Sequence, residues 1–541
     1  MSCYLPTVLY VEARSCQVSD YAITDSNHAI LLTQQTSNSL DAFEIFSLAT
    51  TRLSTTQSPN MPPRYSSIAV IGTGPSGLST LKALNDENAF SRVRVFERRD
   101  RVGGLWHYDP IPDVFPAPGA PHIRNAIPET LPAFTDPVAE DTTARTGVND
   151  LLDSNVGSGT MSFTHTPFPE VNSAVSVRQL GKKNPSRPFR VVSGYLEDLA
   201  RPYLDMISFN TAVERVEKVG LKWRVTVRQS GHFQRNQAAE YWWHEDFDAV
   251  VVASGHYNVP LIPEIEGLRQ AFQAFPGTFE HSKSFRSAND YVDKRVVVVG
   301  GNISSADLIA DLHAVVKGGL YLSQRGRNEA LANVFTLPGV ELKPTITRVE
   351  AGKAGVNVIF ADGTTLQAVD KLLFATGYRL AYPFLVPDPV TPSNRVAGFY
   401  QHVFKIGDPS LAMVGQVRAA LSFRVYEYQA VAVARYFAGT NAVPLPSPAQ
   451  QDQWEVERLG YKGPTALFHE IKPDFKEYFD WLGAFAGPPA ERTTGYELPV
   501  FGDDWPELGF AVLQLKDKYW QSLKAAAREK EEGDGKVQAK L

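Results

Sequence analysis

Short apolar blocks alternate with glycine-rich turns and helical patterns along most of this chain. Apolar runs at residues 68–71, 93–96, 248–254 and 295–299 have the length of buried strands. Amphipathic patterns at residues 78–84 and 306–315 each follow a glycine-rich turn and predict helices. Further strands are predicted at residues 321–323, 357–360 and 371–374. Strands that alternate with helices in this way predict an α/β fold.

Three stretches depart from this alternation. Residues 107–148 are rich in proline, alanine and aspartate, which predicts a long irregular excursion of the kind that covers a site in compact enzymes. Beyond residue 436 the pattern turns helical and aromatic, and the charged residues 528–540 are expected to form a frayed, solvated tail. Residues 1–60 are rich in serine and threonine. We expect that Met61 is the true initiator or that residues 1–60 form a poorly ordered extension; a small structured element is the alternative.

Composition narrows the class of protein. The chain has 541 residues, enough for two or three domains with full cores. A net charge of −6 gives no electrostatic reason to expect nucleic acid as a partner, and no apolar stretch is long enough to span a membrane. Both cysteines, Cys3 and Cys16, lie near the N-terminus. The rest of the chain therefore lacks the cysteine pair of a disulfide reductase, and we expect no metal site.

The first glycine-rich turn has the spacing of a Rossmann dinucleotide-binding motif, G-x-G-x-x-G. It follows a predicted strand, opens a predicted helix, and comprises Gly72, Gly74, Pro75, Ser76 and Gly77. The first glycine permits a tight turn, the second lets backbone approach a pyrophosphate, and the third lets helix and strand pack closely. The helix N-terminus then faces the phosphates with unpaired N–H groups. Glu97, at the end of the next strand, is expected to accept hydrogen bonds from ribose hydroxyls.

A second glycine-rich turn follows the strand at residues 295–299 and precedes a helix. Asn302 and Ser305 replace its second and third glycines, and we expect the turn to survive because asparagine tolerates a positive φ and serine is small. At the end of the next strand, Ser323 and Arg325 are predicted to bind a 2′-phosphate through a hydroxyl and a charge-assisted fork. The nucleotide contacts expected in the turn itself are Gly300, Ser304, Ser305 and Asp307.

Between the two turns lies the segment Phe275-Pro-Gly277-Thr-Phe-Glu-His281-Ser-Lys-Ser-Phe285. In this position its F-x-G-x-x-x-H-x-x-x-F pattern resembles the identifying sequence of the flavin-containing monooxygenases, in particular fungal-type, N- or S-oxygenating class B flavoprotein monooxygenases. The resemblance covers most of residues 67–429. A related family, the Baeyer–Villiger monooxygenases, has tryptophan at the position of Phe285, so phenylalanine favours the flavin-containing branch. His281 is expected to brace the domain junction, with direct participation in catalysis as the alternative.

The resemblance also implies cofactors and further site residues. The sequence after Glu97 is similar to the FAD-binding extension of the family, so the first turn is expected to bind FAD and the second NADPH. Asn155, ahead of Met161-Ser-Phe163, corresponds to the active-site amide that lies near the flavin and the nicotinamide. The remaining FAD contacts implied by the resemblance are Gly104, Leu105, Trp106 and Gln416.

Residues 253–256 and 374–378 resemble the strands that link the two domains in this family. The fold expected is therefore two Rossmann-like dinucleotide-binding domains, with the NADPH domain inserted into the FAD domain. The expected boundaries are 1–60 for the extension, 61–258 for the first part of the FAD domain, 259–375 for the NADPH domain, and 376–541 for the second part of the FAD domain with its helical region and charged tail.

The function implied by the resemblance is an FAD- and NADPH-dependent monooxygenase. It would insert one oxygen atom from dioxygen into an amine nitrogen or a sulfur through a C4a-hydroperoxyflavin, with secondary metabolism as one setting. The alternatives are Baeyer–Villiger oxygenation of a ketone and a non-catalytic nucleotide-binding relative, the latter indicated only by Asn302 and Ser305. The expected partners are a small-molecule substrate and dioxygen, with no nucleic acid and no membrane span, and a homodimer is the candidate assembly. A cytoplasmic location is expected.

Overall fold

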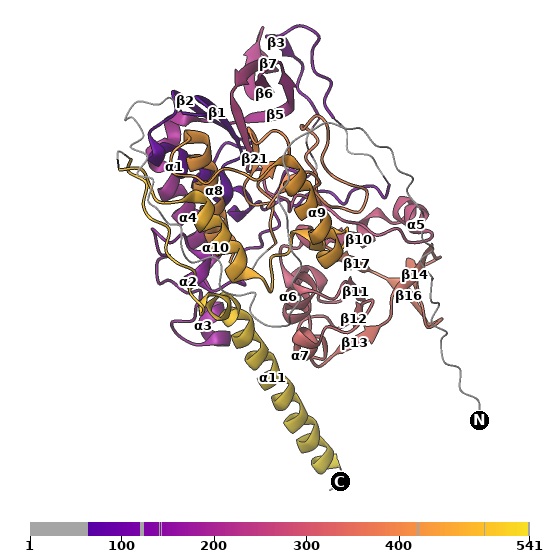
Figure 1. Cartoon of the computed structure of the whole chain (residues 1–541). Helices are drawn as coiled ribbons and strands as arrows, with labels where there is room; N and C mark the ends of the chain where they lie inside the picture. The colour runs from indigo at the N-terminus through magenta and orange to yellow at the C-terminus, as the bar shows by residue number, and fades with distance from the viewer. Residues whose placement is uncertain are drawn as a thin grey trace, which may run out of the picture. The chain divides into compact units, whose positions relative to one another are not determined.

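A computed structural model describes residues 63–538 apart from 120–123, 140, 142, 419–420 and 492 (Figure 1). The predictions made for residues 1–60 lie outside this part of the chain. The described residues contain two sheets of mainly parallel strands, each packed between helices on one face and an antiparallel sheet on the other. The predicted α/β fold with two Rossmann-like domains is confirmed.

The first sheet has the strand order β19-β20-β21-β8-β1-β2-β4. Its parallel strands are β1 (Ser67–Ile71), β2 (Arg92–Phe96), β4 (Ile207–Ser208), β8 (Ala249–Val252) and β21 (Leu411–Met413), and the antiparallel strands β19 (Phe399–Tyr400) and β20 (Phe404–Lys405) form one edge. Side chains of β1 alternate between two cores, with Ile68 and Val70 in one and Ala69 and Ile71 in the other. A strand buried on both faces is apolar throughout, which is why the sequence pattern identified it.

The two faces of the first sheet are covered differently. Helices α1 (Pro75–Glu87), α4 (Phe189–Ala200), α8 (Ser422–Ala438) and α10 (Phe475–Ala486) share one core with it. The other face packs against a sheet of order β3-β7-β6-β5, made of β3 (Ala133–Thr135), β5 (Thr211–Val219), β6 (Lys222–Gln234) and β7 (Gln237–Phe247). This antiparallel sheet was not predicted from the sequence. Together these elements form the first domain.

The second domain is built on a sheet of order β10-β17-β11-β12-β13, in which all strands are parallel. Its strands are β10 (Phe279–His281), β11 (Val296–Val299), β12 (Leu320–Ser323), β13 (Val340–Lys343) and β17 (Lys371–Phe374). Helices α6 (Ile303–Leu312) and α7 (Ala332–Phe335) pack on one face. The other face is covered by α5 (Leu268–Ala274) and the antiparallel strands β14 (Ile346–Ala351), β15 (Val356–Phe360) and β16 (Thr365–Val369).

The second domain is inserted into the first, between β8 and the strands β19–β21. The outgoing segment contains β9 (Val259–Pro260), the returning segment contains β18 (Tyr378–Arg379), and these two strands pair with each other. Leu261 N also donates a hydrogen bond to the carbonyl oxygen of Gly377 at 2.9 Å. The predicted insertion is therefore confirmed, and the two crossings run side by side.

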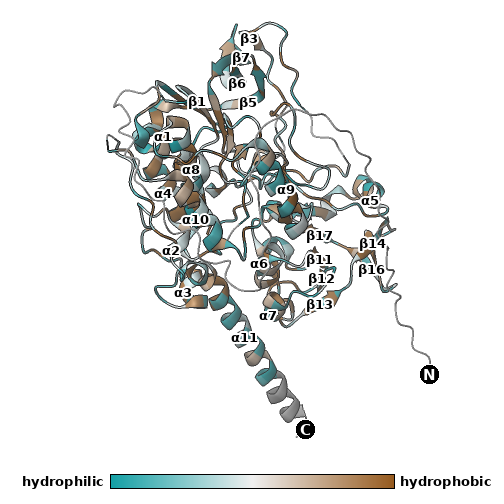
Figure 2. Ribbon diagram, in the orientation of Figure 1, coloured by the Kyte–Doolittle hydropathy of each residue, from teal (hydrophilic) through white to brown (hydrophobic). Residues whose placement is uncertain are grey.

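The C-terminal region is helical, as predicted. It contains α9 (Pro448–Lys462), α10 and α11 (Trp505–Gln538), and α11 packs along α2 (Ser158–Met161), α3 (Ala174–Leu180) and α7 (Figure 1). The prediction of a frayed tail was wrong in part, because the chain stays helical as far as Gln538. Hydrophilic colouring predominates along much of α11 (Figure 2). Among the described residues, no helix has the length and apolar character needed to cross a membrane.

Candidate cofactor and active site

Close backbone packing explains the glycines of the first turn. Gly72 has a φ of +98°, and a Cβ there would lie 2.9 Å from the carbonyl oxygen of Ala253. A Cβ on Gly77 would lie 2.0 Å from the carbonyl oxygen of Gly72, which leaves no room for any side chain. These two positions therefore hold the turn between β1, β8 and α1 in the form of a dinucleotide-binding motif.

The middle of the turn is open toward a ligand. Gly74 precedes α1 without a side-chain cap, so N–H groups at the start of this helix are available to an anion. The next loop packs against it, because Gly103 N donates to the carbonyl oxygen of Thr73 at 2.9 Å and a Cβ on Gly104 would lie 2.9 Å from the Gly74 Cα. This glycine cradle fits a pyrophosphate group. The candidate FAD contacts Leu105 and Trp106 follow Gly104 directly in the 3₁₀ turn Gly104–Trp106.

Glu97 is held beside the same turn. Its side chain is buried and accepts hydrogen bonds from the backbone N–H of Thr73 at 2.8 Å and from the Thr73 hydroxyl at 2.5 Å. The other carboxylate oxygen accepts from Arg99 N at 2.9 Å. A carboxylate oxygen accepts more than one hydrogen bond, so Glu97 keeps capacity for a ribose hydroxyl.

The chain returns to this turn near residue 415. Gly415 has a φ of +91°, and a Cβ there would lie 2.9 Å from the Ser76 Cβ at the start of α1. The neighbouring Gln416 is buried and accepts a hydrogen bond from the hydroxyl of Tyr382. The structure thus brings Ser76 and the segment containing Gln416 together from opposite ends of the first domain.

The second turn differs from the expected geometry. Asn302 has a φ of −131°, an extended conformation that any residue adopts, so the turn survives without using the tolerance of asparagine for a positive φ. Instead it caps α6, accepting a hydrogen bond from Ile303 N at 2.9 Å, while the buried Ser305 hydroxyl accepts from Asn302 N at 3.0 Å. The positive φ is at Gly300 (+136°), where a Cβ would lie 2.4 Å from the carbonyl oxygen of Ala375. The two replacements therefore stabilise the turn by capping its helix.

Of the two residues predicted to bind a 2′-phosphate, only Arg325 has an exposed side chain. Ser323 is 1% exposed, and its hydroxyl donates to the carbonyl oxygen of Pro344 at 2.8 Å. This hydroxyl is therefore engaged inside the domain, contrary to the expectation that it binds a phosphate. Arg325, two residues later, is exposed. Its guanidinium lies just beyond the end of β12.

Asn155 meets the second turn directly. Its Nδ2 donates to Asp307 Oδ2 at 2.8 Å, so an amide of the first domain contacts a carboxylate on α6 of the second domain. Lys516 on α11 donates a hydrogen bond to Asn155 Oδ1 and forms an ion pair with Asp307 Oδ1 at 2.9 Å. The sequence indicated Asn155 and Asp307 separately but not Lys516. The sequence feature that could have indicated Lys516 is its place on α11 one helical turn from Val512 and one from Trp520, both of which are buried.

His281 links the identifying segment to the returning crossing. It is 1% exposed, its Nε2 lies 3.0 Å from the carbonyl oxygen of Gly377, and its Nδ1 accepts from Lys283 N at 3.2 Å. Burial lowers the pKa of His281 to about 4, so the ring is neutral near pH 7. A neutral histidine with both nitrogens bonded to backbone supports the role of a brace at the domain junction.

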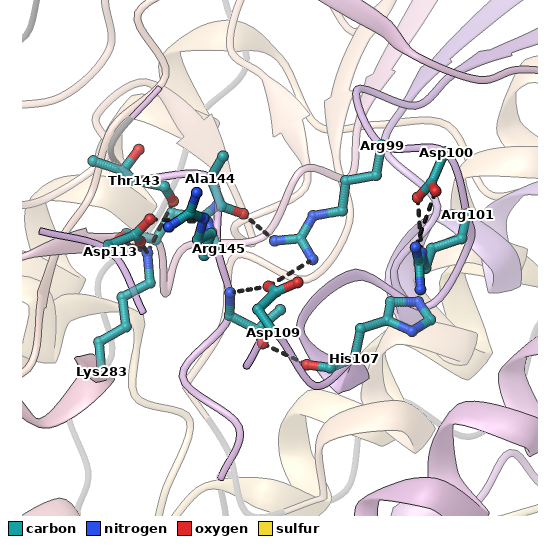
Figure 3. A network of polar contacts seen from close by, with 12 residues as sticks. Arg99, Asp100, Arg101, His107, Asp109, Asp113, Thr143, Ala144, Arg145 and Lys283 are labelled. Atoms are coloured by element: carbon teal, nitrogen blue, oxygen red, sulfur yellow. Dashed lines mark hydrogen bonds and ion pairs between the residues drawn. The ribbon is translucent and has the colours of Figure 1, made fainter. Parts of the chain in front are cut away.

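The irregular excursion is held by ion pairs and hydrogen bonds, some of them buried (Figure 3). Lys283 forms an ion pair with Asp113 at 2.7 Å, and both side chains are buried. Lys283 Nζ also donates to the carbonyl oxygens of Thr143 and Asn258 at 2.9 and 2.8 Å. Nearby, Asp109 accepts from Thr146 N at 2.6 Å and lies 3.8 Å from the Arg99 guanidinium. These contacts, which the sequence analysis did not predict, attach the excursion to both domains.

Two glycine turns on two sheets, one domain inserted into the other, define a flavoprotein with two dinucleotide sites. The family described as flavin-binding monooxygenase-like matches residues 188–335 and 326–491, and an NAD(P)-binding Rossmann-like domain matches residues 70–135. The chain belongs to the flavin-containing monooxygenase family. It is a flavoprotein monooxygenase with FAD and NADPH as cofactors.

Named relatives agree with this assignment. Flavin-containing monooxygenase FMO GS-OX5 of Arabidopsis thaliana is 30% identical over 478 residues, which cover 84% of this chain and 95% of that relative. Flavin-containing monooxygenase iboF of Amanita muscaria is 28% identical, with 79% and 86% covered. The solved structure of S-allyl-L-cysteine S-oxygenase from Allium sativum matches with a TM-score of 0.63 at 24% identity, covering 86% of this chain and 98% of that one, and shows the same fold.

Proposed function

We propose that this monooxygenase transfers one oxygen atom from dioxygen to a nitrogen or sulfur atom of a small molecule, with NADPH as the electron donor. The observation that carries the proposal is the contact of Asn155 with Asp307, because it places the candidate active-site amide of the first domain on the nucleotide turn of the second. When bound, FAD supplies the oxygen chemistry. The protein's part is to hold both nucleotides and to exclude water.

The residues divide between these tasks. The N-terminus of α1 and its glycine cradle would hold the FAD pyrophosphate, Glu97 a ribose, and the segment of Gln416 the flavin end. Gly300, Ser304 and Asp307 would contact the nicotinamide nucleotide at the start of α6. Asn155 would lie between the two cofactors. A nitrogen or sulfur target, rather than a ketone, is supported by phenylalanine at position 285, where the Baeyer–Villiger family has tryptophan. Phe285 is buried and stacks on Tyr291 with ring centroids 5.7 Å apart, so it serves packing.

Substrate candidates test the reaction. With flavin-loaded enzyme and NADPH, a thioether or a tertiary amine should yield its oxide and lower the hydrogen peroxide released per NADPH oxidised. Both quantities are measured in the same reaction by mass spectrometry and a peroxide assay. Product from ketones alone would establish Baeyer–Villiger oxygenation instead. Failure of NADPH to reduce the flavin would identify a non-catalytic relative.

Nucleotide selectivity gives a second test. Arg325→Ala is expected to lower the preference for NADPH over NADH by about tenfold or more, because a charge-assisted hydrogen bond contributes about 1.5–3 kcal/mol. The measurement is the ratio of kcat/KM for flavin reduction by the two nucleotides. Arg327→Ala is the matched control, since Arg327 is an exposed arginine of the same turn that pairs with Glu329 at 3.3 Å. An unchanged ratio in Arg325→Ala would exclude Arg325 as the phosphate ligand.

For this chain, a cytoplasmic location and a homodimeric assembly remain part of the proposal.

A further inference from the structure

The C-terminal helix α11 crosses from one nucleotide domain to the other. Trp505 and Phe510 pack against the core of the first domain, whereas Leu513, Trp520 and Leu523 pack against that of the second. The change of core therefore falls between residues 510 and 513. The covalent linkers cross the junction at β9 and β18, so α11 adds a second, noncovalent connection made of packing and polar contacts.

A tight contact on the first domain fixes the start of this crossing. Gly157 N donates to the carbonyl oxygen of Gly509 at 3.1 Å. A Cβ on Gly157 would lie 2.0 Å from the carbonyl oxygen of Leu508, so glycine is required for the helix to approach this closely. Gly157 follows Asn155 by two residues. The docking of α11 is consequently tied to the loop that carries the candidate active-site amide.

Polar contacts fix the other side. Asn333 Nδ2 donates to Asp517 Oδ1 at 3.0 Å, and Lys524 Nζ donates to Thr336 Oγ1 at 2.7 Å. Asn333 lies in α7 of the second domain and Thr336 directly follows that helix. Lys516 lies between the contact at Gly509 and the contact at Lys524. It precedes Trp520 by one helical turn, and the Trp520 side chain is only 2% exposed.

Lys516 sets the orientation of the Asn155 amide. An amide has one acceptor end and one donor end, and here the cation binds Asn155 Oδ1 while Asp307 accepts from Nδ2. Reversing the amide would direct the NH₂ group at the ammonium and the oxygen at the carboxylate, both of which are repulsive. The side chains of Lys516 and Asp307 are only 17% and 31% exposed, so solvent screens these contacts less than it does at an open surface.

We propose that Lys516 is a positioning residue for the oxygenation site, acting from α11 to hold the Asn155 amide in one orientation and to neutralise Asp307 beside the nucleotide turn. The proposal builds on the proposed function but goes beyond it, because it assigns a role at the site to the C-terminal helix. Without the ammonium, the Asp307 carboxylate would face the nucleotide phosphates uncompensated. Nucleotide binding and the shielding of the reduced flavin should then weaken together.

The test uses the flavin-loaded, full-length enzyme and the variant Lys516→Met, which keeps the apolar stem of the side chain. Titration with NADP⁺, followed by the change in the flavin absorbance spectrum, should show a Kd about tenfold higher. Peroxide released per NADPH should rise, while flavin content and melting temperature should stay near those of the unmodified enzyme. Lys516→Arg, which keeps a charged donor, should restore most of both properties.

Lys524→Met is the matched control. It removes another lysine of α11 that bonds to the second domain, but one that does not contact Asn155. If Lys524→Met raised the Kd for NADP⁺ and the peroxide yield as much as Lys516→Met, weaker docking of α11 would explain both effects and the proposal would be overturned. Unchanged NADP⁺ affinity and coupling in Lys516→Met would also overturn it. If Lys516→Met does not retain flavin, Lys516→Gln is subjected to the same titration and must show the same loss of affinity.

The titration does not depend on turnover. An enzyme that oxygenates none of the offered substrates would contradict the proposed function, yet the NADP⁺ affinities of the variants would still decide the role of Lys516. Conversely, normal affinity and coupling in Lys516→Met would leave the monooxygenase assignment intact. The two conclusions therefore fail on different measurements.

Discussion

Gly74→Val is expected to yield protein with little or no bound flavin. A Cβ on Gly74 has only the Gly104 Cα near it, at 3.6 Å, so the protein itself tolerates the first carbon of the new side chain. The branched carbons would instead occupy the open mouth of the turn, in front of the uncapped start of α1. Overpacking of this kind costs about 1–3 kcal/mol, which corresponds to FAD binding weakened by about 5- to 150-fold.

The flavin-to-protein absorbance ratio after gel filtration measures this effect, and the melting temperature of the flavin-free protein shows whether the fold survives. Gly194→Ala is the matched control, because Gly194 lies within α4 and a Cβ there meets no atom within 4 Å. Full flavin retention by Gly74→Val would show that FAD binds elsewhere.

Asn155→Ala is expected to separate NADPH oxidation from oxygen transfer. The change removes the amide between Lys516 and Asp307, so water gains access to the junction where the two nucleotides are proposed to meet. We expect the fraction of NADPH that ends as hydrogen peroxide to rise by about tenfold, the effect of about 1.4 kcal/mol in hydrogen bonding. Flavin content should be unchanged, since the glycine cradle does not involve this residue.

Peroxide and oxygenated product, both measured per NADPH consumed, report the result. Asn149→Ala serves as the control, since Asn149 lies six residues upstream in the same loop and its side chain accepts a local hydrogen bond from Leu151 N at 3.1 Å. A fully coupled Asn155→Ala enzyme would remove Asn155 from the active site.

The sequence predicted those features that depend on neighbours in the chain. Gly72 and Gly77 were assigned correctly because the motif fixes both the turn and the strand–helix contact within six residues. The turn at Asn302 survives as expected, but for another reason than its φ, because its side chain caps α6. Ser323 was placed at a phosphate because it ends a strand, but its side chain points into the domain and bonds to Pro344.

Contacts between residues far apart in the chain could not be predicted from the sequence. Lys516 and Asn155 are 361 residues apart, and no local pattern indicates that they meet. The buried pair of Lys283 with Asp113 spans 170 residues and was missed for the same reason. The sheet of β5, β6 and β7 was missed despite Asn236 at φ +66° in the tight turn between β6 and β7, because its strands carry many charged residues on their open face.

The pairing of β9 with β18 bears on how such a chain could have arisen. Because the outgoing and returning segments are neighbours, a gene fragment encoding the second domain could enter the first at a single surface point without separating β8 from β21. The C-terminal helix is different, since Trp520 and Leu523 have a partner only once that fragment is present. The apolar side chains of α11 at Leu513, Trp520 and Leu523 therefore depend on the inserted domain, and a chain without that domain would leave them exposed.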